Sequence, residues 1–237
     1  DRPDGVGEMG GGCRDHSEAD KFSMSGKWFY TPDDNSYRIG LIARHYETEA
    51  QEPGYLSEED ARHHPSMTNS YNATDKGTRR MNQVSVHFDT EVSETLAWSA
   101  KTYLNTFDDR RWTQYWRTSS QQERDAYETQ YGALTSLTWR PEVSWLYNFA
   151  LEGGADIQRQ QNQSERYRTK DRARQAQTRD QQFDFDTYGA YVQAEIKPFE
   201  SLKIIPAYRV DKIQGDFTNE MTGMDYDIND YGLIKQP

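Results

Sequence analysis

The sequence predicts an all-β protein, an antiparallel transmembrane β-barrel, and three observations carry this prediction. Apolar and polar residues alternate with a period of two in one run after another, which is the pattern of half-apolar strands. Hydrophobic residues make up only 34% of the 237 residues, yet aromatic residues reach 13%. Short turns alternate along the chain with long polar segments. Outer-membrane barrels combine these properties, because their alternation hides the apolar face in the average composition and aromatic girdles line both membrane interfaces.

Two other protein classes fit the composition less well. The sequence holds no run of ~18–20 apolar residues, the length that a transmembrane helix needs. A net charge of −11 would suit a disordered chain, but disordered chains are poor in aromatic residues. The same acidity argues against nucleic acid as a partner, because proteins that bind nucleic acids present basic surfaces.

About eight strands are expected from the alternation. They share apolar residues at every second position and run over 22–30, 37–44, 83–89, 96–103, 131–139, 145–152, 188–197 and 202–211. In the first run, Met24 and Trp28 share one face while Ser23 and Ser25 lie on the other. The runs span 7 to 10 residues, and half of them reach the ~9–11 residues with which a tilted strand crosses the hydrocarbon layer.

The connections between these strands alternate between short and long. Short turns are expected at 31–35, 91–94, 140–143 and 198–201, and long polar loops at about 48–80, 108–126, 156–182 and 212–230. Compact soluble domains rarely carry even one structureless loop longer than ~12–15 residues. A barrel with short periplasmic turns and long extracellular loops explains the alternation. Aromatic residues lie close to the short turns, as an interfacial girdle requires, at Trp28, Tyr30, Trp98, Trp139 and Trp145.

Several motifs resemble those of TonB-dependent siderophore receptors. They are Gly54-Tyr55-Leu56-Ser57 with the following Glu58-Glu59-Asp60-Ala61, Gln83-Val84-Ser85-Val86, Asn105–Trp112 and Tyr131–Leu134. Among these receptors, those for citrate-type, polycarboxylate ferric complexes are the most similar. The resemblance implies a barrel of about 22 strands with an N-terminal plug domain, which imports iron complexes with energy relayed by TonB.

The chain departs from that family pattern in its extent. It holds about eight of the strands, and no segment reads as a plug or as a TonB-recognition box. Its last residues, Leu233–Pro237, lack the terminal aromatic residue that complete outer-membrane barrels usually carry. The sequence therefore predicts that residues 1–237 are an internal part of a larger barrel, with the plug domain and the C-terminal strands absent.

One alternative stays open from the sequence. Eight strands can also close on themselves into a small outer-membrane barrel with a structural or adhesive role. Pairing of the first strand with the last would identify that form, because lipid does not tolerate unpaired strand edges. An enzyme is not expected, since Ser99 and His87 lie on neighbouring predicted strands without an acidic partner or a catalytic motif.

Two arginine-rich segments form the candidate ligand-binding site in this acidic chain. Guanidinium groups bind carboxylates through two parallel hydrogen bonds and stay charged at any relevant pH, and aromatic residues supply apolar pocket walls. The candidate residues are Arg110, Arg111, Trp112, Tyr115, Trp116, Arg117, Arg166 and Arg168. An anionic ferric siderophore is the expected ligand. The alternatives are arginines that contact lipopolysaccharide phosphates, or plainly solvated loops.

No metal ion or organic cofactor is expected. His63 and His64 could meet His45 or His87, but no cysteine or carboxylate has the spacing of a structural zinc site. The run 225–230 is acidic like a calcium loop, but it lacks the glycine and the glutamate that such a loop needs. The resemblance implies further partners: TonB, through an N-terminal region outside the chain, and the lipid and lipopolysaccharide of the bacterial outer membrane.

Overall fold

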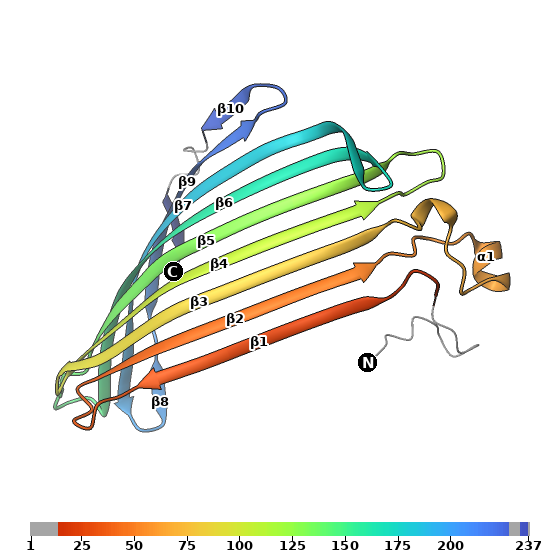
Figure 1. Ribbon diagram of the computed structural model, residues 1–237. Coiled ribbons are helices and arrows are strands. Elements are labelled where there is room, and N and C mark those ends of the chain that lie inside the picture. The colour runs from red at the N-terminus through yellow and green to blue at the C-terminus, as the bar shows by residue number, and fades with distance from the viewer. Residues whose placement is uncertain (1–13, 228–232, 237) are drawn as a thin grey trace.

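A computed structural model describes residues 14–227 and 233–236 and shows a long, curved antiparallel sheet (Figure 1). Its eleven strands are β1 (Ala19–Tyr30), β2 (Tyr37–Gln51), β3 (Lys76–Ser93), β4 (Leu96–Thr113), β5 (Gln121–Trp139), β6 (Asn148–Lys170), β7 (Ala173–Phe199), β8 (Leu202–Ile204), β9 (Ala207–Asn219), β10 (Met224–Asp227) and β11 (Leu233–Gln236). They pair in the order β1-β2-β3-β4-β5-β6-β7-β9-β10, while β8 pairs with β7 and β11 with β9. The prediction of an all-β antiparallel fold is confirmed.

The helical segments of the described chain lie in the connection between β2 and β3. They are helix α1 (Glu58–His63) and the 3-10 turn η1 (Ser70–Asn72). Ser57 caps α1, because its hydroxyl accepts a hydrogen bond from the Asp60 N–H at 3.0 Å. In the part of the chain that the structure describes, no helix is both long and apolar enough to cross a membrane.

The strands run far beyond the alternating segments that predicted them. β6 and β7 extend over 23 and 27 residues and are joined by Asp171 and Arg172 alone. The prediction of loops at 108–126 and 156–182 is therefore wrong, because each segment is mostly strand. Polar residues occupy both faces there, so the sequence pattern of a half-apolar strand is absent while the backbone ladder continues.

The other two predicted loops, 48–80 and 212–230, agree better with the structure. The connection between β2 and β3 covers 52–75 rather than 48–80. In the expected loop 212–230, β9 continues to Asn219 and forms a hairpin with β10, and residues 228–230 lie outside the described residues. The end of the sheet that carries these connections is called the long-loop end below, and the opposite end the short-turn end.

The short turns lie close to their predicted positions, with two differences. The third connection covers 140–147, so β6 begins at Asn148 rather than at Trp145. The last predicted strand is split into β8 and β9 around Pro206. A proline has no N–H to donate to the ladder, so the regular pairing stops before it and resumes after it.

The register of the sheet fixes which side chains share a face, because directly opposed residues of antiparallel strands point to the same side. The pairing from β1 to β9 keeps one register through the middle of the sheet, with irregularities near its two ends. One face carries an apolar belt toward the short-turn end, formed by Met24, Trp28, Tyr30, Leu41, Ala43, Val84, Val86, Phe88, Trp98, Ala100, Leu104, Tyr131, Ala133, Leu137, Trp139, Leu151, Ala155, Ile157, Tyr188, Ala190, Val192 and Val210. This side is called the apolar face and the other the polar face.

The belt is a surface rather than a core. None of the hydrophobic side chains in the described residues is buried, and Trp28, Leu137 and Ile157 are 56%, 50% and 50% exposed. A soluble protein does not leave so large a contiguous apolar surface in water. Along β5 the belt reaches from Tyr131 to Trp139, or ~26 Å at ~3.3 Å per residue. These nine residues are within the ~9–11 that a tilted strand needs to cross the lipid-facing band of an outer-membrane barrel.

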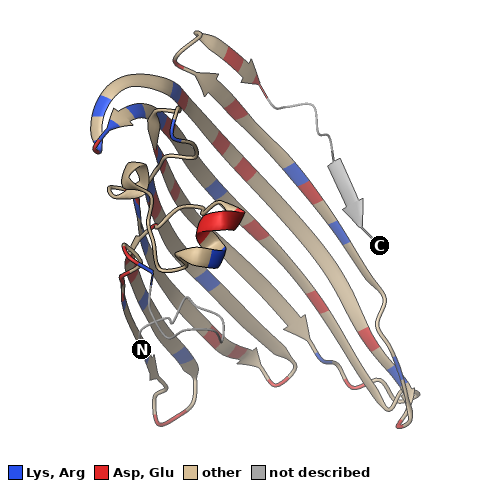
Figure 2. Cartoon of the chain, turned by 90° about the vertical axis from the view of Figure 1, so that its right-hand side faces the viewer, with Lys and Arg blue, Asp and Glu red and all other residues tan. Residues whose placement is uncertain are grey.

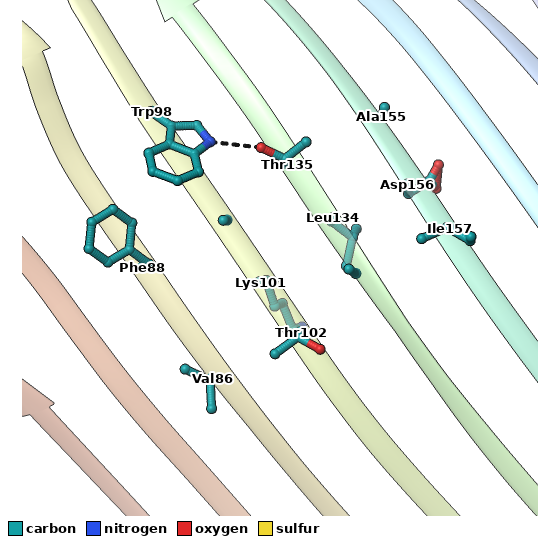
Figure 3. A pocket seen from close by; sticks show the side chains of 12 residues that line it. Val86, Phe88, Trp98, Lys101, Thr102, Leu134, Thr135, Ala155, Asp156 and Ile157 are labelled. Carbon is teal, nitrogen blue, oxygen red and sulfur yellow. Dashed lines mark hydrogen bonds between the residues drawn. The ribbon is translucent and has the colours of Figure 1, made fainter.

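An aromatic girdle lies at the short-turn edge of the belt, where the sequence predicts it. Trp98 donates its indole N–H to the Thr135 hydroxyl at 2.8 Å, and the rings of Trp28 and Tyr30 stack 6.3 Å apart. Beside Trp98, small side chains leave a shallow groove of about 550 Å³ that Phe88 borders (Figure 3). An exposed ring whose N–H is satisfied suits the boundary between lipid and water.

Four glycines of the polar face lie directly opposite aromatic residues. The pairs are Phe29–Gly40, Tyr103–Gly132, Tyr191–Gly154 and Phe185–Gly215. A Cβ added at Gly154 would collide with the Tyr191 ring, which covers the glycine and donates a hydrogen bond to Glu152 at 2.5 Å. Aromatic rings over glycines shield the backbone where a sheet bends. These pairs therefore support the curvature seen in Figure 1.

The described part of the sheet is open at both edges. β1 pairs with β2 alone, and β10 and β11 pair with β9 alone. A small closed barrel requires the first strand to pair with the last. Among the described strands, β1 does not pair with β10 or β11, so the pairing that would identify a small closed barrel is not observed.

Candidate functional site

A buried polar network ties together the connections of the long-loop end. Asp75 accepts hydrogen bonds from Asn72 Nδ2 at 2.8 Å, from the Gln114 N–H at 2.7 Å and from Gln121 Nε2 at 2.7 Å. Gln121 in turn accepts a hydrogen bond from the Thr169 hydroxyl at 3.1 Å. The side chains of Asn72, Asp75, Gln121 and Thr169 belong to residues that are at most 3% exposed. Such networks rigidify the segments that they join, so this end of the sheet is held in a defined shape.

A second cluster lies on the face that continues the apolar face toward the long-loop end. Glu123 and Asp125 of β5 are each 2% exposed. Arg110 of β4 donates to Asp125 at 2.9 Å, and Arg174, near the tip of the β6–β7 hairpin, lies 2.7 Å from Asp125 and 2.8 Å from Glu123. The Arg174 guanidinium also lies 3.8 Å from the ring centroid of Tyr167. Arg110, Glu123, Asp125 and Arg174 are called the outer clamp.

The outer clamp lies beyond the apolar belt, and its pKa values show burial competing with ion pairing. Burial raises the pKa of Asp125, and the hydrogen bond from Arg110 opposes that rise. The hydrogen bond to Glu123 raises the pKa of Arg174 despite its partial loss of solvent. The charges of both arginines are thus matched within the protein. The outer clamp therefore has a structural role: it fixes the hairpin tip against β4 and β5.

A row of four arginines crosses the opposite, polar face at a similar height. Arg111 of β4 lies directly opposite Arg124 of β5, Arg124 opposite Arg166 of β6, and Arg166 opposite Arg179 of β7. Three strand spacings of ~4.8 Å make the row ~14 Å wide. Figure 2 shows several lysine and arginine segments near the turn of the β6–β7 hairpin at this end of the sheet, and others along the strands. These four residues are called the arginine row.

The arginine row has few negative partners. Among the described residues, Arg111 is its one member in a salt bridge, with Glu52. The Nε atom of Arg124 is buried without a hydrogen-bond partner, and the Tyr115 ring centroid lies 5.3 Å from its guanidinium. Burial lowers the pKa of Arg166, and the charges of the neighbouring arginines lower it further. Like charges directly opposite each other destabilise a sheet, so the row favours an anion beside it.

Amide and aromatic side chains line the polar face between the arginine row and the level of the belt. Asn105 donates to Gln130 at 3.0 Å, and Gln160 is directly opposite Gln130 on the next strand. The rings of Phe183 and Phe217 lie 4.7 Å apart. The wall below the row thus offers hydrogen-bonding groups next to flat apolar surfaces, as the walls of ligand pockets do.

The structure brings several predicted site residues together. Arg111 and Arg166 belong to the arginine row, and Tyr115 packs on it. Arg168 lies on the same face as Arg166, two residues nearer the hairpin tip. Trp116, which is 72% exposed, and Arg117 lie in the 114–120 connection next to β4.

Arg110 and Trp112 turn the other way. They flank Arg111 on a strand, so their side chains point to the opposite face. There Arg110 belongs to the outer clamp, and the Trp112 ring lies 5.9 Å from both the Arg110 guanidinium and the Lys76 ammonium. A loop at 108–126 would have let neighbouring residues converge on one ligand. A strand separates them, so we do not retain these two residues as ligand contacts.

Two members of the arginine row, Arg124 and Arg179, are not among the candidate site residues that the sequence predicts. A signal for them exists in the alternating charges of Glu123-Arg124-Asp125 and of Arg179-Asp180. On a strand, this order sends the arginine to one face and the acids to the other. The alternation of charge is informative only if these segments are strands, and their polar composition does not indicate a strand.

The histidines named as possible metal ligands do not converge. His45 hydrogen bonds to Asn82 at 2.7 Å, and His87 to Ser85 at 3.0 Å on the polar face. Within residues 14–227 and 233–236, no group of three or more histidine, cysteine, aspartate and glutamate side chains is placed to hold a metal ion. Half of the acidic run 225–230 lies outside the described residues.

Comparison with known proteins places this sheet in a family. Residues 14–232 match the family model described as TonB dependent receptor-like, beta-barrel. The chain is similar to the structure of the ferric citrate transporter FecA in its unliganded form, with a TM-score of 0.77 at 16% identity over 90% of this chain and 32% of that chain. For the closed form of the ferric-catecholate import receptor Fiu from E. coli K12, the TM-score is 0.66 at 9% identity over 87% of this chain and 36% of that chain.

A further similar structure is the copper transporter OprC, with a TM-score of 0.59 at 16% identity over 93% of this chain and 33% of that chain. No curated protein sequence matches the chain. The chain spans about a third of the length of these structures. At this low identity, the structural similarity shows a shared fold alone. The family model covers nearly the whole chain, and its members are transporters rather than enzymes. This chain therefore belongs to the TonB-dependent receptor β-barrel family of the bacterial outer membrane.

Proposed function

We propose that this chain is part of the wall of an outer-membrane transporter that takes up an anionic ferric siderophore of the polycarboxylate type. The observation that carries the proposal is the arginine row, four guanidinium groups side by side on the polar face of adjacent strands. In a barrel the polar face lines the lumen and the apolar belt faces lipid. The row would then face the path that an imported molecule takes.

The height of the row above the belt supports this role. On β5, Arg124 lies seven positions from Tyr131, which is at the upper edge of the belt. At ~3.3 Å per residue this is ~23 Å along the strand. Along β5 polar residues prevail on both faces over that stretch, as expected for a strand that stands in water outside the membrane. With the long-loop end outside the cell, the row would be among the first groups that an arriving ligand meets.

The chemistry of the row suits several carboxylates of one complex. Each guanidinium presents a fork of donors that matches a carboxylate, and it carries its charge at any physiological pH. Hydrogen bonds to charged groups contribute ~1.5–3 kcal/mol each, so two or three such contacts give substantial affinity without any covalent step. The buried network around Asp75 and the outer clamp hold the strands in place before the ligand arrives.

A bare metal cation suits the row poorly. OprC, which shares the fold, is a copper transporter. Four neighbouring positive charges would repel a copper ion or any other free cation, whereas they attract a complex whose net charge is negative. The charge of the row therefore favours an anionic complex over a cation.

The proposed partners follow from the family. TonB would act through a region outside this chain, and outer-membrane lipid and lipopolysaccharide would surround the belt. Release of the ligand would need a second conformation with fewer of these contacts.

Ligand binding by the full-length receptor in detergent tests the proposal. Ferric citrate serves as the anionic probe and a neutral ferric hydroxamate as the comparison. The double variant Arg124→Gln, Arg166→Gln should bind ferric citrate at least ~100-fold more weakly, because two charge-assisted contacts are lost. Arg140→Gln, an exposed arginine at the short-turn end, is the matched control and should bind normally.

Two results would contradict the proposal. One is unchanged ferric citrate binding in the double variant. The other is a wild-type receptor that binds the neutral hydroxamate complex and not the anionic complex.

A further inference from the structure

Arg111, at one end of the arginine row, already holds a carboxylate. Arg111 Nε lies 2.7 Å from Glu52 Oε1 and 2.8 Å from Oε2, and Arg111 Nη2 lies 2.6 Å from Oε2. A guanidinium holds a ligand carboxylate with the same forked arrangement of donors. Glu52 thus occupies the contact that the proposed ligand would make with Arg111.

Glu52 reaches Arg111 across an intervening strand. Glu52 directly follows β2, and its N–H donates to the Asp75 carbonyl at 3.0 Å. Gly77 of β3 lies between them, directly opposite Arg111. A Cβ at Gly77 would be 3.1 Å from Glu52 Oε1, closer than an ordinary contact. The glycine therefore leaves room for the carboxylate beside Arg111, in line with the arginine row.

A cavity of about 290 Å³ adjoins this ion pair and is lined in part by Tyr55 and Tyr115. Tyr115 also packs on Arg124, so the cavity and the arginine row share a wall. The side chain of Glu52 is 26% exposed. It can therefore swing into solvent without crossing a packed core.

We propose that Glu52 is a built-in competitor for Arg111, whose carboxylate is replaced by a carboxylate of the ligand. The inference rests on the proposed function, because it needs an anionic ligand at the row. Replacing one carboxylate by another keeps Arg111 paired before and after binding. In the ligand-free protein Glu52 occupies Arg111, so it lowers the affinity for a ligand that has to displace it from that arginine.

The test is Glu52→Gln in the full-length receptor, with ferric citrate as the probe. Loss of the competitor should tighten binding about three- to tenfold, the effect expected for one hydrogen-bonded contact. Glu49→Gln is the matched control, since Glu49 pairs with Lys76 at 2.6 Å on the other face, and it should leave the affinity unchanged. Binding by Glu52→Gln that is unchanged or weaker overturns the inference, and weaker binding would show that Glu52 positions Arg111 instead.

A double-mutant cycle separates competition from a general effect of charge. In an Arg111→Gln background, Glu52→Gln should give no gain, because the contested arginine is gone. A gain that persists in that background overturns the inference. Failure of the proposed function looks different, since Arg124→Gln would then leave ferric citrate binding intact. If Arg124→Gln weakens binding while Glu52→Gln changes nothing, this inference alone fails.

Discussion

At the long-loop end of the described sheet, the arginines of the outer clamp are paired with carboxylates, whereas most arginines of the arginine row are not. On one face, Arg110 and Arg174 are matched by Glu123 and Asp125, which are almost fully buried. On the other face, Arg124 has no carboxylate partner among the described residues, and its Nε atom lacks a hydrogen bond. Both arrangements come from one stretch of β5, where acids and arginine alternate.

The comparison separates charge that holds the fold from charge that is available for binding. A buried ion pair is costly to break, because the remaining partner is left without solvent or a counter-charge. A partly exposed arginine among other arginines is repelled by its neighbours. Replacing it with a neutral residue relieves this repulsion, and binding of an anion compensates the charge. The first kind of site should therefore respond to mutation in stability, and the second in affinity.

The largest effect on stability is expected at the outer clamp. Asp125→Ala removes the charge-assisted hydrogen bonds that Arg110 and Arg174 donate to Asp125 and should lower the free energy of unfolding by ~3–5 kcal/mol. Urea unfolding of the full-length receptor in lipid vesicles measures it. Asp109→Ala is the matched control, because Asp109 forms an exposed pair with Arg79 and should cost at most ~1 kcal/mol. Equal losses of unfolding free energy in the two variants would contradict the claim that the outer clamp stabilises the fold more than an exposed ion pair does.

The next effect tests the two faces at the level of the belt. Ala133 and Leu134 are neighbours on β5, with Ala133 on the apolar face and Leu134 on the polar face. Ala133→Arg should destabilise the folded barrel by ~2–4 kcal/mol, because it places a charge in lipid. Leu134→Arg should be tolerated in a wet lumen. Reversed tolerance, measured by the same unfolding experiment, would mean that the faces are assigned the wrong way round.

A smaller effect is expected where glycines face aromatic rings. Gly154→Val places a side chain against the Tyr191 ring and should cost ~1–3 kcal/mol. Combining it with Tyr191→Ala removes the collision and should recover part of the loss. Strictly additive losses would show that the ring does not depend on the glycine.

The smallest stability effect is expected in the arginine row. Arg124→Gln removes one of several like charges and should change the free energy of unfolding by less than ~0.5 kcal/mol, or raise it slightly. Arg110→Gln, the comparable change in the outer clamp, should destabilise clearly. The comparison fails if Arg124→Gln proves as destabilising as Arg110→Gln.

The fold could be read from the sequence wherever one face of a strand is apolar. Runs such as 131–139 alternate cleanly, and the register of the sheet brings their apolar residues onto one face. The upper halves of β6 and β7 could not be recognised, because polar residues on both faces carry no period. Their pairing is decided by the neighbouring strands, which extend the backbone ladder over residues that look like loop.

The candidate site could be predicted only in part for the same reason. Composition was enough to point to arginines near Arg111 and Arg166. Register was needed to find Arg124 and Arg179 and to separate Arg110 from the row. The sequence states which residues alternate, but the position of one strand against the next depends on contacts between segments far apart in the chain.

The most direct measurement is a crystal structure of the full-length receptor with ferric citrate, in which the anomalous signal of iron locates the complex. The account predicts an iron peak on the lumen side, facing Arg124 and Arg166, with carboxylate oxygens within hydrogen-bond distance of their guanidinium groups. An iron peak remote from these two arginines, in a receptor that binds ferric citrate specifically, would contradict it.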